Sequence, residues 1–90
     1  MEGLLMKCNM IMAVLIDQRT DVAPKVQEIL TEYGCIIDTR LGLHQVQDCA
    51  DEGLIILHLC GEKKQIEELE QELKTLDRVG VNKMKVSFDD

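Results

Sequence analysis

Four short apolar runs alternate with two amphipathic segments along this chain, and their order is the strongest constraint on its fold. The first run, residues 8–16 (CNMIMAVLI), is almost continuously apolar and stops at Asp17. Its length favours a strand that is buried on both faces over a piece of buried helix. We therefore expect a core strand at the start, with residues 1–6 as a loose extension in front of it.

The first amphipathic segment covers residues 20–34 and is predicted to be a helix. Thr20 or Asp21 can cap its start, and Pro24 is tolerated only in a first turn. Gly34 is a natural stop at the other end. Apolar residues recur at helical spacing and form one face, made of Val22, Val26, Ile29, Leu30 and Tyr33.

The second amphipathic segment, residues 62–80, is predicted to be a helix that ends at Gly80. Glu and Lys fill one side of it, which we interpret as solvated surface rather than as a binding patch. The opposite, apolar stripe consists of Ile66, Leu69, Leu73, Leu76 and Val79.

The remaining apolar runs predict three more strands. Residues 35–46 and 53–60 form a hairpin around a polar turn (QDCADEG), and residues 81–88 form the last strand. In the first strand of the hairpin the apolar face is formed by the odd positions Ile37, Leu41 and Leu43. Its even positions carry Asp38, Arg40, Gly42 and His44.

The predicted order is strand, helix, strand, strand, helix, strand (βαββαβ). Right-handed crossovers turn this order into the ferredoxin-like split βαβ fold of the α+β class. The four antiparallel strands would take the order 4-1-3-2, with both helices on one face. A chain of 90 residues fits one such domain.

The face of this sheet that lies away from the helices has no cover within the chain. A contiguous apolar patch of that kind usually marks an interface, and a domain of this size buries only a marginal core. We therefore expect a homodimer or a higher homo-oligomer. The bare residues would be Met10, Met12, Val14, Leu54 and Ile56, or their neighbours if the strand phase is reversed.

The net charge of −7 narrows the classes of partner. Phosphate contacts need clustered Lys and Arg, so direct binding of nucleic acid or of an anionic membrane is disfavoured. No stretch reaches the roughly 20 apolar residues of a spanning helix. No basic region precedes the first apolar run as it would in a signal peptide, so we expect a cytoplasmic protein.

The four cysteines, Cys8, Cys35, Cys49 and Cys60, include no C-x-x-C pair. This spacing disfavours a zinc ribbon or a thioredoxin-type site. In a cytoplasm we expect them to be reduced thiols. Three lie in predicted strands, where a free cysteine behaves as a small apolar residue.

Both histidines lie in the predicted hairpin and are the first candidate site. His44 and His58 have even numbers on adjacent strands, so we expect them on one sheet face, about 5–10 Å apart, with Gly42 near His58. They could be hydrogen-bonded structural residues, line a ligand pocket, or bind zinc or nickel together with the Cys49 thiolate. We expect a mainly structural role, because one chain offers fewer than the four ligands of a closed zinc site.

Arg40 is the second candidate. Its guanidinium, beside Gly42, could hold a carboxylate or phosphate through two parallel hydrogen bonds, or it could pair with Asp38. The sequence shows no Gly-rich phosphate loop, no Ser-His-Asp order and no evident acid pair. We therefore predict no catalytic residues and expect that the chain is not an enzyme.

The stretches VQEILTEYGCIIDTRLGLH, EGLIILHLCG and GVNKMKVSF carry a family resemblance. A helix that ends in Tyr-Gly, Arg-x-Gly at Arg40 and a closing Gly-Val at Gly80 resemble the iron-only hydrogenase system regulator family of bacteria. The resemblance implies an ACT-like domain, a homo-oligomer that binds a small effector, and a role in regulating a hydrogenase system. Many ACT domains carry a Gly between the first strand and the first helix, which this chain lacks.

The same element order, with His44 before a turn that contains Cys49, also resembles the C-terminal domain of the nickel-responsive repressor. That resemblance implies a nickel or zinc sensor with His44, Cys49 and His58 as candidate ligands, although one His at most matches the repressor's His-x-His. The leading hypothesis is a non-enzymatic ACT-like regulatory domain that binds a small molecule or a partner protein. Its candidate ligand-binding residues are Arg40, Gly42, His44 and His58, and a pure oligomerisation module is a further alternative.

Overall fold

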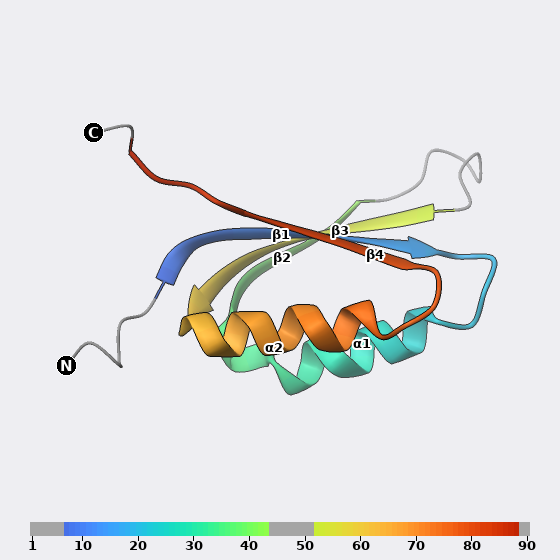
Figure 1. The fold of residues 1–90 in the computed structure, drawn as a ribbon. Coiled ribbons are helices and arrows are strands. Elements are labelled where there is room, and N and C mark those ends of the chain that lie inside the picture. Colours follow the sequence, from blue (N-terminus) through green and yellow to red (C-terminus); the bar gives the residue numbers. More distant parts are fainter. Residues whose placement is uncertain (1–6, 44–51, 89–90) are drawn as a thin grey trace.

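The computed structural model describes residues 7–43 and 52–88 of the chain. The strands form one antiparallel sheet in the order β2-β3-β1-β4, and both helices lie on the same side of it (Figure 1). The predicted α+β ferredoxin-like fold and its strand order are confirmed. The elements are β1 (Lys7–Asp17), α1 (Ala23–Glu32), the 3-10 helix η2 (Gly34–Ile36), β2 (Ile37–Leu43), β3 (Glu52–Gly61), α2 (Lys63–Lys74) and β4 (Val79–Lys85).

The core lies between the helices and the two central strands, β1 and β3. Met12 pairs with Leu57 and Val14 with Ile55, and residues paired across antiparallel strands project to the same face. These side chains pack against the apolar stripes of the two helices. The other core residues are Ile16, Val22, Val26, Leu30, Ile36, Leu59, Ile66, Leu69, Leu73 and Val81.

The predicted exposure of Met12 and Val14 is wrong, since both are fully buried, and Met10 packs partly buried against the core. Because β1 is apolar at odd and even positions alike, hydropathy does not distinguish its two faces. Leu54 and Ile56 lie away from the helices, as predicted. We define the open face of the sheet by Ile11, Ala13, Leu15, Leu41, Leu54, Ile56 and Met84.

Helix α1 begins later than predicted, because its N-cap residue is Val22 rather than Thr20 or Asp21. The Thr20 hydroxyl donates to the carbonyl of Asp17 at 2.8 Å and accepts the N–H of Val22 at 3.4 Å. Thr20 therefore stabilises the turn before the helix instead of the helix itself. Pro24 lies in the first turn, as predicted.

The C-cap of α1 is Tyr33, so this helix ends directly before Gly34, as predicted, but Gly80 does not end α2. Helix α1 ends at Glu32 and Gly34 begins η2, whereas α2 ends at Lys74 and Gly80 lies within β4. Among the described residues Arg78 has a positive φ, 62°, and no glycine does. The left-handed turn between α2 and β4 therefore falls on an arginine. None of the helices in the described ranges is long and apolar enough to cross a membrane.

Polar contacts join α2 to its neighbours. The hydroxyl of Tyr33, just after α1, donates to Oε2 of Glu72, and this contact raises the pKa of Tyr33 to about 12. Lys83 Nζ on β4 donates to Oε1 of Glu70 at 2.7 Å, and Lys74 Nζ lies 3.1 Å from the other oxygen of Glu70. Lys83 first, and Lys74 second, lower the pKa of Glu70.

The expectation of reduced thiols is wrong for two of the cysteines. Cys8 on β1 and Cys60 on β3 form a disulfide, whereas Cys35 is free and exposed. The two partners meet because β1 and β3 pair antiparallel and the register shifts between Lys7 and Met10. Cys49 lies outside the described residues.

Candidate functional site

The predicted site residues divide between the two faces of the sheet. Arg40 and Gly42 pair with core residues of β3 and lie on the helix-covered side, whereas His58 pairs with Thr39 on the open side. The prediction that Gly42 and His58 share a face is therefore wrong. The cause is a register shift in β2 between Ile37 and Thr39, because an extra residue there reverses the alternation of faces.

Of the three candidate metal ligands, His58 is the one that the structure describes, because His44 and Cys49 lie outside the described residues. Within residues 7–43 and 52–88 no group of three His, Cys, Asp or Glu side chains is arranged to hold a metal ion. The nickel or zinc site stays a prediction.

A cavity of about 330 Å³ lies beside Arg40, between the first half of α1 and the adjoining ends of β2 and β3. Its polar lining comes from three side chains: Gln18, Gln27 and Arg40. Ile16, Ala23 and Leu54 add apolar surface. The cavity thus combines one cation and two amides with an apolar wall.

The Arg40 guanidinium is exposed and has no ion pair with a described carboxylate. The predicted pairing with Asp38 does not form, because Asp38 Oδ2 lies 3.2 Å from Nδ1 of His58 and accepts the Thr39 hydroxyl at 3.1 Å. A guanidinium presents five N–H donors in one plane, which suits a carboxylate or a phosphate. Arg40 can therefore receive an anion at the cavity.

Two glycines shape the cavity wall. A Cβ at Gly53 would come within 2.3 Å of Nε2 of Gln18, so the missing side chain lets the Gln18 amide lie across β3. A Cβ at Gly42 would meet nothing within 4 Å, so this wall opens onto free space. A larger residue at position 42 would extend into that space.

His58 bridges three strands at the other end of the sheet. Its Nε2 lies 2.9 Å from the carbonyl oxygen of Cys8 on β1, and its Nδ1 lies 3.2 Å from Asp38 on β2. The Cys8 carbonyl, and then the Asp38 carboxylate, raise the pKa of His58. A protonated imidazole donates to both acceptors at once. These contacts tie His58 to β1 and β2 through partners that the sequence did not indicate, and its mainly structural role stays a prediction.

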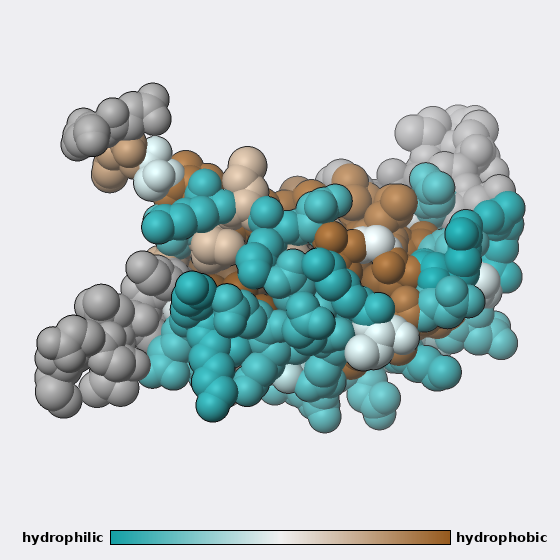
Figure 2. All heavy atoms as spheres, in the orientation of Figure 1, coloured by the Kyte–Doolittle hydropathy of each residue, from teal (hydrophilic) through white to brown (hydrophobic). Residues whose placement is uncertain are grey.

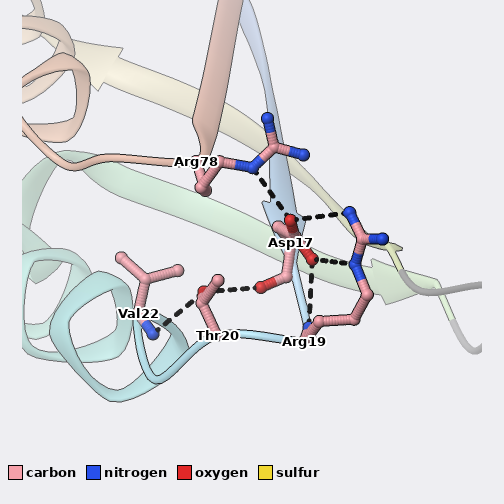
Figure 3. Close-up of polar contacts among 5 residues, drawn as sticks. All are labelled: Asp17, Arg19, Thr20, Val22 and Arg78. Atoms are coloured by element: carbon pink, nitrogen blue, oxygen red, sulfur yellow. Dashed lines mark hydrogen bonds and ion pairs between the residues drawn. The ribbon is translucent and has the colours of Figure 1, made fainter.

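A second polar cluster, missed from the sequence, surrounds Asp17 at the end of β1 (Figure 3). Arg19 donates from Nε to Oδ1 and from Nη2 to Oδ2, both at 3.0 Å, and its backbone N–H also donates to Oδ1. Arg78 Nε donates to Oδ2 at 2.9 Å. The side chain of Arg19 first, and that of Arg78 as a further partner, hold the pKa of Asp17 well below its usual range.

The signal for this cluster was an acidic residue that ends a continuous apolar strand. Asp17 is 6% exposed, whereas both arginines project into solvent. The carboxylate is fully engaged by guanidinium and backbone donors, so it joins the loop after β1 to the turn before β4. We assign it a structural role.

The open face of the sheet is an exposed apolar surface. Leu15, Leu41 and Met84 are 40%, 53% and 57% exposed. Leu41 pairs with Ile56 and Met84 with Ile11, so the four strands contribute to one continuous patch. In Figure 2 hydrophobic atoms gather over the sheet, above a largely hydrophilic helical side. This face is the second candidate site, and it suits a protein partner.

The element order and the strand order define a small α+β domain with a ferredoxin-like, ACT-like fold. No family model matches the chain, and no curated protein matches it. Among solved structures, the uncharacterized protein TM1266 from Thermotoga maritima is similar, with a TM-score of 0.78 and 22% sequence identity. That comparison covers 87% of this chain and 95% of TM1266.

Two further structures are described as regulatory proteins. One is described as a glycine cleavage system transcriptional repressor and has a TM-score of 0.63 at 17% sequence identity. The comparison covers 90% of this chain and 46% of the repressor, so this chain spans about half the length of the repressor. CPII from Thiomonas intermedia K12, a nitrogen regulatory PII-like protein, has a TM-score of 0.54 at 10% identity over 92% and 96%. At these identities the comparisons show the shared fold.

Proposed function

We propose that this chain is a non-enzymatic regulatory domain that binds a small anionic molecule beside Arg40. The observation that carries the proposal is the exposed Arg40 guanidinium at the rim of the 330 Å³ cavity, which has no ion pair with a carboxylate within residues 7–43 and 52–88. The amides of Gln18 and Gln27 add polar groups that can orient a bound carboxylate or phosphate. A CPII structure contains ADP, AMP and acetate, so a similar fold accommodates phosphate groups as well as a carboxylate.

Self-association through the open face forms the second part of the proposal, with a second copy of the chain as the partner. At about 25 cal/mol per Å² of apolar surface, covering this patch stabilises a dimer by several kcal/mol. The partly exposed Leu15, Leu41 and Met84 supply much of that area. Regulators commonly couple a ligand site to an interface, since binding at one then shifts the other.

The regulated system is proposed to be an iron-only hydrogenase system, on the sequence resemblance described above. A catalytic role is disfavoured by the surroundings of His58, whose two ring nitrogens contact a carbonyl and a carboxylate rather than a nucleophile. The regulatory descriptions of the similar structures support the same class of function.

Calorimetric titration with small carboxylates, amino acids, ADP and AMP tests the ligand site. We expect one of these to bind the wild type and Arg40→Lys to bind it at least tenfold more weakly, because Lys cannot reproduce the planar fork. Gly42→Leu should also weaken binding by filling the free space. The control is Lys63→Gln, which removes an exposed cation far from the cavity and should leave the affinity unchanged. Equal affinities for Arg40→Lys and the wild type would contradict the site.

Sedimentation at micromolar concentration tests the interface. We expect the wild type to form a dimer or a larger species and Leu41→Glu to shift it toward a monomer, because a buried carboxylate opposes association. The matched control is Gln71→Glu on the exposed side of α2. A monomeric wild type would remove this part of the proposal and leave the Arg40 site standing.

A further inference from the structure

We infer that Cys8 and Cys60 form a reversible thiol–disulfide switch that clasps the beginning of β1 to the end of β3. The bond joins two strands across a register shift, at a separation of 52 residues along the chain. The reductant that opens it would be a dithiol, either a small molecule or a protein with a pair of reactive cysteines.

The bond is open to attack from solvent. Cys8 is exposed, whereas Cys60 is half-buried on β3. Thiol–disulfide exchange requires a thiolate to reach one sulfur of the bond, so we expect attack at Cys8, the more exposed residue of the pair. Structural disulfides that persist are usually inaccessible to such reagents, whereas exposed ones are the labile ones.

Reduction takes two successive thiol–disulfide exchange steps. A thiolate of the dithiol attacks Sγ of Cys8, the Cys8–Cys60 bond breaks, and Cys60 leaves as a thiolate that takes up a proton. The second thiol of the reductant, as a thiolate, then attacks the mixed disulfide and releases Cys8. The protein gains two electrons and two protons, and the dithiol becomes a disulfide.

Contacts other than the disulfide keep the two sulfurs near each other after reduction. His58 Nε2 lies 2.9 Å from the Cys8 carbonyl oxygen. The next residue, Asn9, accepts the N–H of Val86 at 2.8 Å through its carbonyl and donates its side-chain amide to the Val86 carbonyl at 2.7 Å. These contacts hold the strand in place, so that the thiols can close again. The switch therefore loosens the end of the sheet without unfolding the domain.

The Cys8–Cys60 disulfide also lies beside the surface proposed for self-association. Cys60 is two residues from His58 and four from Ile56, and these even positions of β3 share the open face. Reduction of the disulfide would loosen the end of the sheet next to that surface, while the contacts of His58 and Asn9 keep the strand paired. Thiol chemistry would in this way act on the surface proposed for self-association.

The test compares thermal unfolding in reduced and in oxidised dithiothreitol. Closing a loop of this length restricts the unfolded chain, so we expect reduction to lower the melting temperature of the wild type by about 10 °C or more. Reoxidation should restore the original value. Cys8→Ser and Cys60→Ser should each melt like the reduced wild type in both reagents. The control Cys35→Ser, which removes the free exposed thiol of the described residues, should keep the full difference.

Mass spectrometry gives a second readout that does not depend on stable variants. Alkylation with iodoacetamide before and after reduction should label the peptides that contain Cys8 and Cys60 only after reduction. Labelling of both peptides in oxidised protein would overturn the proposal. So would a melting temperature that is equal in the two reagents, or a difference that Cys35→Ser abolishes.

Discussion

Arg78 Nε donates to Oδ2 of Asp17 at 2.9 Å, and the backbone N–H of Asp17 donates to the carbonyl of Arg78 at 3.1 Å. The two residues, 61 positions apart, are therefore bonded through side chain and backbone together. Arg78 also has the positive φ of 62° that a residue with a Cβ rarely adopts. Its contacts with Asp17 explain how an arginine can hold this conformation.

Substitutions at Arg78 separate the ion pair from the backbone strain. Arg78→Ala removes the guanidinium but keeps the Cβ at positive φ, whereas Arg78→Gly removes both. We expect both variants to be less stable than the wild type, and the Gly variant to be more stable than the Ala variant by about 1 kcal/mol. Urea unfolding measures the difference. Equal stabilities of the two variants would show that the φ of Arg78 carries no strain.

Because the pKa of Asp17 is lowered in the folded protein, we expect the protein to lose stability in acid. The pKa of Asp17 is lowered relative to an ordinary value of 3.8, so the contribution of Asp17 is present above that pH and is lost as the pH falls below it. Asp17→Asn should lower stability at neutral pH and reduce the acid-dependent loss. Denaturation at a series of pH values measures this. The control Asp21→Asn, in the same loop, should keep the wild-type profile; a similar flattening in it would contradict the assignment.

For His58 we expect the opposite dependence of stability on pH, near neutrality, because its pKa is raised. Because its folded-state pKa is raised above 6.5, its contribution is complete below that pH and is lost as the pH rises through the folded-state value. We expect the wild type to lose stability above pH 6.5 and His58→Gln to lose this dependence. Asp38→Asn should retain part of it, because the Cys8 carbonyl is the larger cause. Should the Gln variant show the wild-type slope, another group is responsible.

Gly61 predicts a steric penalty at the end of β3. A Cβ there would lie 2.7 Å from Cγ2 and 3.0 Å from Cβ of Ile36, which is buried and branched and cannot rotate away. We expect Gly61→Ala to destabilise the protein by about 1–3 kcal/mol. Gly34→Ala, where a Cβ meets nothing within 4 Å, is the matched control and should be nearly neutral. Chemical denaturation of the two variants decides the point.

The fold could be predicted because its signals are local and repeated. Apolar runs of strand length alternate with helical periodicity, and crossover handedness leaves few topologies for that order. The phase of β1 could not be predicted, since Ile11 and Met12 are equally apolar and only the packing of the helices separates them. Leu54 and Ile56 of β3 were correctly predicted to lie away from the helices. The sheet therefore has an uncovered apolar face, although the β1 residues predicted for it were wrong.

The candidate site depended on pairings that have no local signal. The register shift after Ile37 turns Arg40 toward the helices and leaves Asp38 to His58. A second shift, at the start of β1, brings Cys8 to Cys60. Gly80 was a reasonable helix stop by propensity, but the bonds to Asp17 place the left-handed turn at Arg78 instead. Each of these differences comes from contacts between distant segments.

Tyr33 turns the contact between the two helices into an optical signal. The chain contains one tyrosine and no tryptophan, so its near-ultraviolet absorbance reports almost entirely on this ring. While the hydroxyl donates to Glu72 the phenol ionises at a pKa of about 12, and if the helices separate the value returns toward 10. The phenolate band in alkaline solution therefore reads the position of α1 against α2 without any attached dye.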